Sequence, residues 1–367
     1  MAKRDATLTY AGHLQLARLL SCQERESERQ GRPAHDEMLF IVVHQAYELW
    51  FKQILFELDC IQVLFAGARM DDRDLGTAVR GVGRIAQIQR LLIQQLDVLE
   101  TMTPLDFLDF RDLLVPASGF QSVQFRLIET RLGLRREDRV NFEARPFDAR
   151  LEARNKTRLR DAAGRPSLLD QIGEWLERTP FVAAPGYDFR KVYGKAVREM
   201  LDGEAALVRA NRALSEADAA AELASIEAAR ERFESILDET RHGELKEQGV
   251  WRLSARSLQA ALFINLYRDE PVLQLPFRLL SGLMDMDENL TTWRYRHALM
   301  VQRMIGRKVG TGGSSGYDYL NRTAEKHRVF GDLFALSTYF IPRARLPALP
   351  ADVRRVMGYT YAEDKSA

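Results

Sequence analysis

A long run of helical periodicity near the start of the chain constrains the fold more than any other feature. From about residue 35 to residue 65, apolar side chains recur three and four positions apart: Leu39, Phe40, Val43, Ala46, Tyr47, Trp50, Phe51, Ile54, Leu58 and Ile61. This spacing predicts one long helix, and its wide apolar stripe predicts that the helix is largely buried. Asp36 and Glu37 stand where a helix start favours negative charge.

Similar periodicity marks most of the remaining chain. It predicts helices at about residues 14–22, 73–99, 120–132, 253–267, 276–283 and 291–305, with others starting near residues 315 and 329. Thr103 before Pro104 is typical of a helix start, because the hydroxyl caps the first turn and proline lacks only an N–H that has no partner there. No segment alternates as a strand does, so the predicted class is all-α, a helical bundle.

Composition divides the chain into parts. Residues 134–166 are rich in arginine and acidic residues with little periodicity, which predicts a long surface segment. A narrow apolar seam between Leu223 and Leu237 predicts an added helical hairpin that lies on the main body. We expect a helical core of residues 1–134 and 250–345, a surface loop plus helical insertion at residues 135–249, and a C-terminal tail at residues 346–367.

Charge and hydropathy exclude several classes of protein. The 367 residues carry 53 Lys+Arg and 52 Asp+Glu, a net charge of +1, which gives no case for a nucleic-acid partner or an anionic membrane surface. There is no apolar run long enough for a bilayer and no secretory signal pattern, so we expect a cytoplasmic protein with no membrane association. Cys22 and Cys60 form no metal-binding spacing and are expected to be reduced.

The first long helix carries a candidate pocket histidine. Phe40 and His44 are four residues apart and share one face. A histidine on an apolar face costs free energy unless its ring nitrogens find partners. His44 is therefore either a core residue bonded to a carbonyl group or part of a pocket wall, with Phe40 stacking on a ligand and His44 addressing its polar edge.

His297 lies one turn after Trp293 on a similarly apolar face. It is either a core histidine or an axial haem ligand, because haem iron needs a neutral imidazole nitrogen in an apolar wall. Met300 and Met304 nearby are more typical of core packing. No C-x-x-C-H segment exists, so a haem here would not be covalently attached.

Arg111 shares a helix face with Phe107 and Leu114, at spacings of four and three. A guanidinium on such a face either pairs with an acidic residue or binds an anion such as a substrate carboxylate.

The segment 310–316 has four glycines around Thr311 but fits neither the dinucleotide-binding nor the NTP-binding spacing. It is either a connector or a loop whose backbone N–H groups bind an anion. Asp285, Asp287 and Glu288 lie close together in the sequence and could form a metal site. Negative charge at a helix start is the better explanation for them.

Several long motifs together resemble the tryptophan 2,3-dioxygenase family. They are HDEMLFIVVHQAYELWFKQILFELD at 35–59, ETMTPLDFLDFRDLLVPASGFQSVQFRL at 100–127, WRYRH at 293–297, GTGGSSGYDYL at 310–320 and LSTYFIPR at 336–343. The similarity runs from about residue 7 to 345 and is poor from about 135 to 250. It implies a bundle that encloses a b-type haem, ferrous in the active state.

The resemblance also implies roles for single residues. His297 would be the proximal iron ligand, and His44 the distal residue that accepts a hydrogen bond from the indole N–H. Substrate would meet Phe40, Phe107, Leu114, Arg111 and Thr311, the last two binding its carboxylate. The haem or its propionates would meet Ser118, Arg126, Trp293 and Tyr319. Tyr10 would reach a neighbouring subunit's pocket, which implies a homotetramer.

The implied activity is cleavage of the indole C2–C3 bond of L-tryptophan with O₂ to give N-formyl-L-kynurenine. One departure leaves alternatives open: the family's Tyr-Gly-x-Tyr reads Tyr10-Ala11-Gly12-His13 here. His13, in the substrate-binding set, is either a neutral exchange or the sign of a relative that acts on a modified tryptophan, such as a β-methyltryptophan, even inserting one oxygen to give an oxindole. A haem-binding sensor without turnover is the third alternative, and the presence of His44, Arg111 and Thr311 argues against it.

Overall fold

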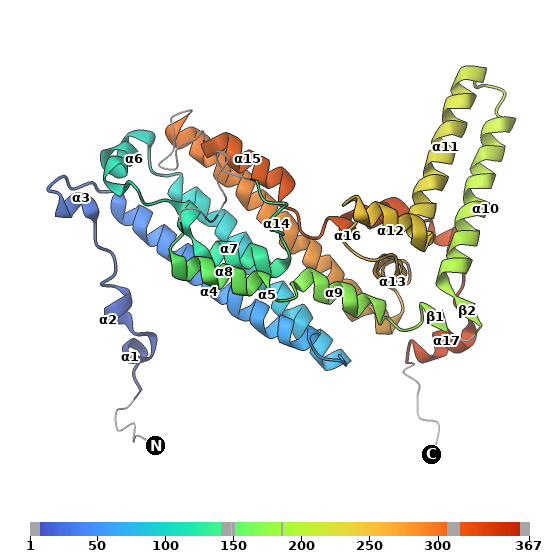
Figure 1. Ribbon diagram of the computed structural model, residues 1–367, viewed down its shortest axis with the longest axis horizontal. Coiled ribbons are helices and arrows are strands. Elements are labelled where there is room, and N and C mark those ends of the chain that lie inside the picture. Colours follow the sequence, from blue (N-terminus) through green and yellow to red (C-terminus); the bar gives the residue numbers. More distant parts are fainter. Residues whose placement is uncertain (1–7, 141–147, 149–150, 185, 307–315, 360–367) are drawn as a thin grey trace, which may run out of the picture.

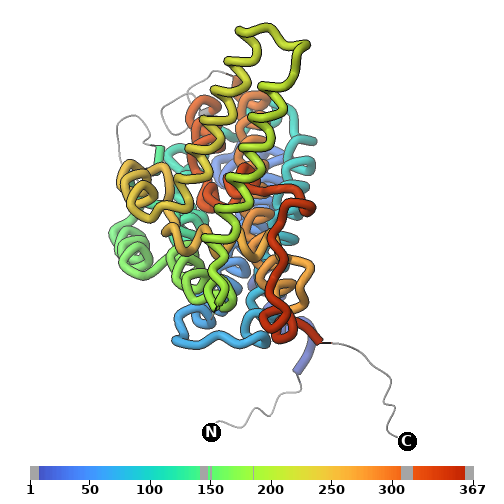
Figure 2. Tube along the Cα trace, turned by 90° about the vertical axis from the view of Figure 1, so that its right-hand side faces the viewer, coloured from blue at the N-terminus to red at the C-terminus, as the bar shows by residue number. Residues whose placement is uncertain are grey.

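The computed structural model describes residues 8–140, 148, 151–184, 186–306 and 316–359. Helices dominate this part of the chain, as the two views in Figures 1 and 2 show. The strands in the described ranges are β1 (Ala183–Ala184) and β2 (Tyr187–Asp188), which pair antiparallel with Ala183 opposite Asp188. The predicted all-α class is therefore confirmed.

Three long helices form the centre of the molecule: α4 (Glu37–Phe65), α5 (Asp72–Leu99) and α14 (Gln274–Ile305). Helix α5 packs against both of the others. Small residues permit this close approach, because a Cβ atom on Gly282 would come within 2.7 Å of Val82 Cγ1. Leu58, Ile61, Ile85, Leu96 and Leu283 are almost completely buried along the shared faces.

Helix α14 is one continuous helix, so the prediction of two helices at 276–283 and 291–305 was wrong. Pro276 lies in its first turn, where a missing N–H costs no hydrogen bond. The helix-start explanation for the acidic residues was also wrong, since Asp287 lies in the middle of α14 and is 2% exposed. Its carboxylate accepts hydrogen bonds from the backbone N–H groups of Val329 and Phe330, at 3.0–3.1 Å.

Shorter helices complete the core around one end of this layer. They are α6 (Pro104–Arg111), the 3₁₀ turns η1 (Asp112–Leu114) and η2 (Gly119–Gln121), α7 (Val123–Leu132) and α15 (Gly316–Lys326). The predicted start of α6 is confirmed: Thr103 Oγ1 accepts a hydrogen bond from the Asp106 N–H, and the Asp106 carboxylate accepts one from the Thr103 N–H. Helix α7 begins after η2, three residues later than expected.

The second part of the chain begins beside α7 and continues toward the other end of the molecule. It contains α8 (Ala153–Ala163), α9 (Leu168–Glu177), α10 (Phe189–Ala210), α11 (Glu216–Leu237), α12 (Glu239–Glu247) and α13 (Ala255–Leu266). Helices α10 and α11 form the hairpin that projects from the body in Figure 1. Tyr193 and Ile236, near its base, are fully buried. Leu134, Arg139 and Val140 are buried as well, so the start of the supposed surface segment 134–166 belongs to the interior.

The ends of the chain carry short elements. They are α1 (Tyr10–Leu14), α2 (Leu16–Leu19), α3 (Glu26–Arg29), η3 (Pro271–Leu273), α16 (Gly331–Ala335), η4 (Leu336–Tyr339), η5 (Arg343–Arg345) and α17 (Ala351–Val356). Instead of one helix at 14–22, α1 and α2 are separated by Gln15, whose φ is 53°. Near the other end, Val353 and Met357 are buried, and Met357 O accepts a hydrogen bond from Val272 N–H at 3.1 Å.

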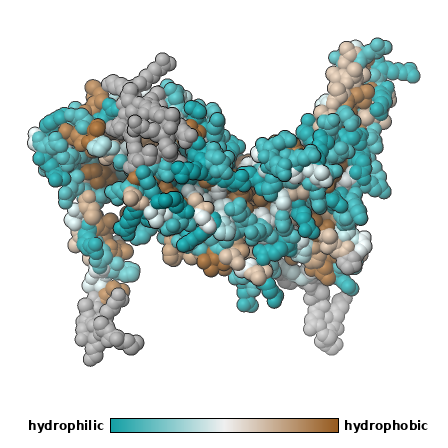
Figure 3. Space-filling model, viewed as in Figure 1, coloured by the Kyte–Doolittle hydropathy of each residue, from teal (hydrophilic) through white to brown (hydrophobic). Residues whose placement is uncertain are grey.

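Apolar residues are exposed on the segment that carries α1 and α2, which extends away from the body and shows brown in Figure 3. Leu8, Tyr10, Leu14, Leu19 and Leu20 are between 39% and 78% exposed. Among the residues that the structure describes, no helix combines the length and hydropathy required to cross a membrane.

Candidate active site

A cavity of about 310 Å³ lies between α4, α6, α7, α14 and α15. Its size falls in the range of small-molecule sites, roughly 300–1,000 Å³. The cavity is mainly apolar, with aromatic and methionine side chains such as Phe40, Tyr47, Phe125, Trp293 and Met300 in its wall. Its polar side chains gather in distinct places. This is the arrangement expected of a site that encloses a large, mostly apolar ligand.

Helix α4 contributes Phe40 and His44 to one wall, which is one of the two readings that the sequence left open. Their ring centroids are 4.0 Å apart, and Phe40 also stacks on Phe107 at 5.8 Å. His44 Nδ1–H donates to the Phe40 carbonyl at 2.7 Å, which leaves Nε2 as the nitrogen with a free lone pair. Burial lowers the pKa of His44, so the ring is neutral at pH 7. His44 is therefore both a carbonyl-bonded histidine and a pocket residue.

Helix α14 contributes His297 to the cavity. The ring stacks on Trp293, with centroids 5.1 Å apart, and Nδ1 is buried without a hydrogen-bond partner among the described residues. Burial, and secondly the neighbouring His44, lower the pKa of His297 to about 4. The imidazole is thus neutral in an apolar wall, the state in which it can bind a metal ion.

The polar end of the cavity contains the predicted residues Ser118, Arg126 and Tyr319. Burial opposes the charge on Arg126, but Glu129 and Tyr319 together raise its pKa above the ordinary value. Sequence reasoning missed four further residues that line this end: Glu129, Arg294, Thr323 and His327. Arg294 lies inside the WRYRH motif, and that was the one signal that could have revealed it.

Arg111 lines the cavity beside Phe107, at the end of α6. Leu114, predicted with them, does not line it; the helix ends at Arg111, and Leu114 packs against the hydrophobic core from η1. Thr311 lies outside the described residues. Tyr10 and His13 are exposed on α1 and do not line the cavity of their own chain.

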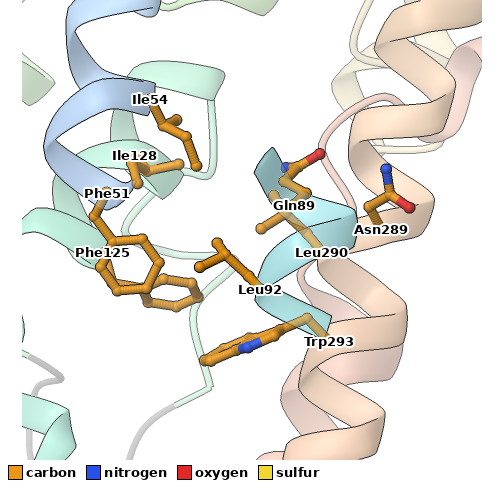
Figure 4. Close-up of a pocket in the computed structure, with 9 residues that line it drawn as sticks. All are labelled: Phe51, Ile54, Gln89, Leu92, Phe125, Ile128, Asn289, Leu290 and Trp293. Carbon is orange, nitrogen blue, oxygen red and sulfur yellow. The ribbon is translucent and has the colours of Figure 1, made fainter. Parts of the chain in front are cut away.

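A second, much smaller cavity of about 10 Å³ lies behind the wall of the first (Figure 4). The rings of Phe51, Phe125 and Trp293 are common to both cavities. The amide side chains of Gln89 and Asn289 lie at its other side in Figure 4. The gap is about the size of one water molecule.

These features fit a haem better than a metal ion bound by protein alone. No group of three or more His, Cys, Asp or Glu side chains in the described ranges is placed to hold a metal ion. One unpartnered imidazole in an apolar wall, with basic side chains at one end of the cavity, matches an iron porphyrin with its carboxylates. Fold and site together are those of an all-α protein with a cavity, between histidine-bearing helices, that fits a haem.

Comparison with known proteins identifies the family. The sequence profile described as tryptophan 2,3-dioxygenase matches residues 2–340. Proteins named tryptophan 2,3-dioxygenase are similar over nearly their whole length: that of Bdellovibrio bacteriovorus is 47% identical over 96% of this chain and 98% of its own, and that of Alteromonas mediterranea is 44% identical over 98% and 99%. The Dictyostelium discoideum protein is 44% identical over 96% of this chain and 88% of its own. The chain belongs to the tryptophan 2,3-dioxygenase family.

Proposed function

We propose that this protein cleaves the indole C2–C3 bond of L-tryptophan with O₂ to give N-formyl-L-kynurenine, as an oxidoreductase of tryptophan catabolism. The observation that carries the proposal is one cavity with neutral histidines from α4 and α14, His44 and His297. Relatives in bacteria and eukaryotes carry the same enzyme name. Neither the oxindole-forming relative nor the haem-binding sensor is favoured by these comparisons.

The cofactor in this proposal is a b-type haem, ferrous in the active state. His297 is the protein's ligand to its iron, and Ser118, Arg126, Trp293 and Tyr319 surround the porphyrin. When bound, the haem supplies the redox chemistry that activates O₂, which no amino-acid side chain supplies.

The residues of the chain bind and orient the substrate in this proposal. Phe40 and Phe107 pack on the indole ring and exclude water from it. His44 Nε2, which has a free lone pair, accepts a hydrogen bond from the indole N–H. Arg111, together with Thr311, binds the substrate carboxylate. Holding the indole in one orientation reduces the entropy cost of the reaction and explains why the site needs a polar group at each end of the substrate.

We also propose that the active form is a homotetramer in the cytoplasm. Val42, Leu49, Phe56 and Val63 recur every seven residues on α4 and are between 46% and 73% exposed. A stripe of this spacing suits a helix–helix interface between subunits. Tyr10 on the projecting α1 would reach a neighbouring pocket. The division into a haem-binding core, an insertion at 135–249 and a tail also remains our proposal.

The experiment that tests this function uses protein reconstituted with haemin and reduced. L-Tryptophan is added under ¹⁸O₂, and mass spectrometry measures how many ¹⁸O atoms the product contains. We expect N-formylkynurenine with two labelled oxygen atoms. One labelled atom, or turnover only of 3-methyl-substituted substrates, would contradict the proposal, as would binding of haem without any product. His13→Tyr is the matched variant, and we expect it to leave the substrate preference unchanged.

A further inference from the structure

Four side chains converge on the carboxylate of Glu129, which is 1% exposed on α7. Oε2 accepts hydrogen bonds from Arg126 Nη1, at 3.2 Å, and from Arg139 Nη1. Oε1 accepts one from Arg294 Nη2 at 2.8 Å and faces His327 Nδ1 at 3.4 Å. Burial alone would raise the pKa of Glu129, but the guanidinium groups hold it well below the ordinary value, so the carboxylate stays ionised.

The hydrogen bonds of His327 fix its tautomer. The Val140 backbone N–H donates to His327 Nε2 at 3.0 Å, so this nitrogen carries the lone pair and Nδ1 carries the hydrogen. Nδ1–H therefore points its hydrogen at Glu129 Oε1. Burial lowers the pKa of His327, which keeps the ring neutral. His327 thus serves as a fixed spacer between Glu129 and the backbone of residue 140.

These contacts join segments that are far apart in sequence. Arg126 and Glu129 belong to α7, Arg294 to α14, Arg139 to the segment after α7, and His327 directly follows α15. Arg294 Nη1 also donates to the His327 carbonyl at 3.1 Å, and Arg139 Nη2 to Thr130 Oγ1 at 3.0 Å. Four of the five members line the large cavity; Arg139 alone stands behind them.

We propose that Glu129 is a positioning residue that holds Arg126 and Arg294 where their guanidinium groups bind the carboxylates of the porphyrin. The inference rests on the proposed haem and assigns roles to Glu129, Arg294 and His327 that the family motifs left open. Arginine side chains have much rotamer freedom, so binding an anion orders them at a cost in entropy. A carboxylate that already orders them removes this cost before the ligand arrives.

A purely structural role for the cluster predicts a different behaviour. Buried ion pairs contribute little net stability, because desolvation offsets most of their attraction. A structural cluster would affect every ligand of the cavity equally, since it would act only through the shape of the wall. A positioning role affects only ligands that carry the carboxylates. The two readings therefore differ in which porphyrin responds to a change at Glu129.

The test compares haem with haem dimethyl ester, in which the carboxylates are blocked. Both are loaded into wild-type protein and Glu129→Gln, and their dissociation rates are measured by transfer to an excess of a haem-scavenging protein. We expect Glu129→Gln to release haem roughly tenfold to a hundredfold faster, the scale of one charge-assisted hydrogen bond. Release of the dimethyl ester should match that from the wild-type protein. Equal acceleration of both porphyrins, or of neither, would overturn the proposal.

Asp332→Asn is the matched control. Asp332 is a buried carboxylate that accepts hydrogen bonds from the backbone N–H groups of Arg252 and Leu253 and does not line the cavity. It should release both porphyrins at wild-type rates. If Glu129→Gln fails to fold, Glu129→Asp keeps the charge but withdraws it by one methylene, and should show a smaller acceleration for haem alone; equal or absent effects would again overturn the assignment. Wild-type protein that binds no haem would instead refute the proposed function itself.

Discussion

Acid should destabilise the haem-free protein through His297. Burial lowers the pKa of this imidazole from its ordinary value of 6.5 to about 4. The unfolded chain therefore binds a proton at His297 between these two values, while the folded protein does not. The stability that depends on the neutral ring is present above pH 6.5 and is lost as the pH falls toward 4. Protonation of His297 would also occupy a ring nitrogen that the proposed haem iron needs as its ligand.

The magnitude follows from the difference between the two pKa values, 6.5 − 4, or about 2.5. At about 1.4 kcal/mol for each pKa unit, the full effect is about 3.4 kcal/mol, of which about 2.5 kcal/mol is reached by pH 4.5. His297→Leu cannot bind the proton. The free energy of unfolding of each haem-free protein is measured by urea denaturation. As the pH falls from 7 to 4.5, the value for His297→Leu should rise by about 2.5 kcal/mol relative to the wild-type value.

Titrating groups that do not interact with His297 cancel in this comparison, because they are common to both proteins; His44, whose charge lowers the pKa of His297, is the neighbour that the substitution affects. His13→Gln, which removes an exposed imidazole, serves as the control and should follow the wild-type protein at every pH. A difference between wild type and His297→Leu that stays constant within about 0.5 kcal/mol over this range would refute the reasoning. It would mean that the cavity hydrates the ring as well as bulk water does.

Three further predictions concern the site and the helices that carry it. Phe110 is fully buried against Phe40 and Phe107, so Phe110→Ala should lower the free energy of unfolding by about 3–5 kcal/mol in urea denaturation, and a loss below about 1 kcal/mol would contradict the packing. Glu37→Ala should cost about 2–3 kcal/mol in the same assay, because its buried carboxylate accepts hydrogen bonds from the backbone N–H groups that begin α3; an unchanged midpoint would count against this. Arg111→Met should raise KM for tryptophan roughly tenfold or more in steady-state kinetics without changing the haem spectrum, and wild-type KM would remove its role as a carboxylate ligand.

Periodicity predicted α4 and α5 correctly because their burial is one-sided. Helices α4 and α5 each present an apolar stripe to the core, and such a stripe is visible in the sequence. The sequence could not decide whether His44 bonds a carbonyl or faces a ligand, because a helix position fixes a direction and not a partner. In the structure Nδ1 bonds the Phe40 carbonyl while the ring lines the cavity, so the carbonyl bond is confirmed and the contact with a ligand stays a prediction.

The local sequence pattern does not reveal contacts between residues that are far apart in the chain. Glu37 looked like a helix-start charge, yet its carboxylate caps a different helix, α3. Glu129 and His327 are separated by 198 positions, and nothing in local spacing pairs them. The continuity of α14 was hidden because the polar residues around Asp287 resemble a break, whereas Asp287 itself accepts hydrogen bonds from the backbone N–H groups of Val329 and Phe330. Such pairings depend on tertiary structure, which local propensity does not encode.

Helix α14 has a mechanical consequence for the whole chain. Its 32 residues form a rod about 48 Å long, at 1.5 Å per residue. The rod contacts α13 and α16 before it reaches the cavity, where its last turns carry the imidazole of His297. We expect that neither end of α14 unfolds alone, because the residues packed against the other end would lose the helix that covers them. We therefore expect the protein to unfold as a single cooperative unit, although its sequence pattern indicates separate parts.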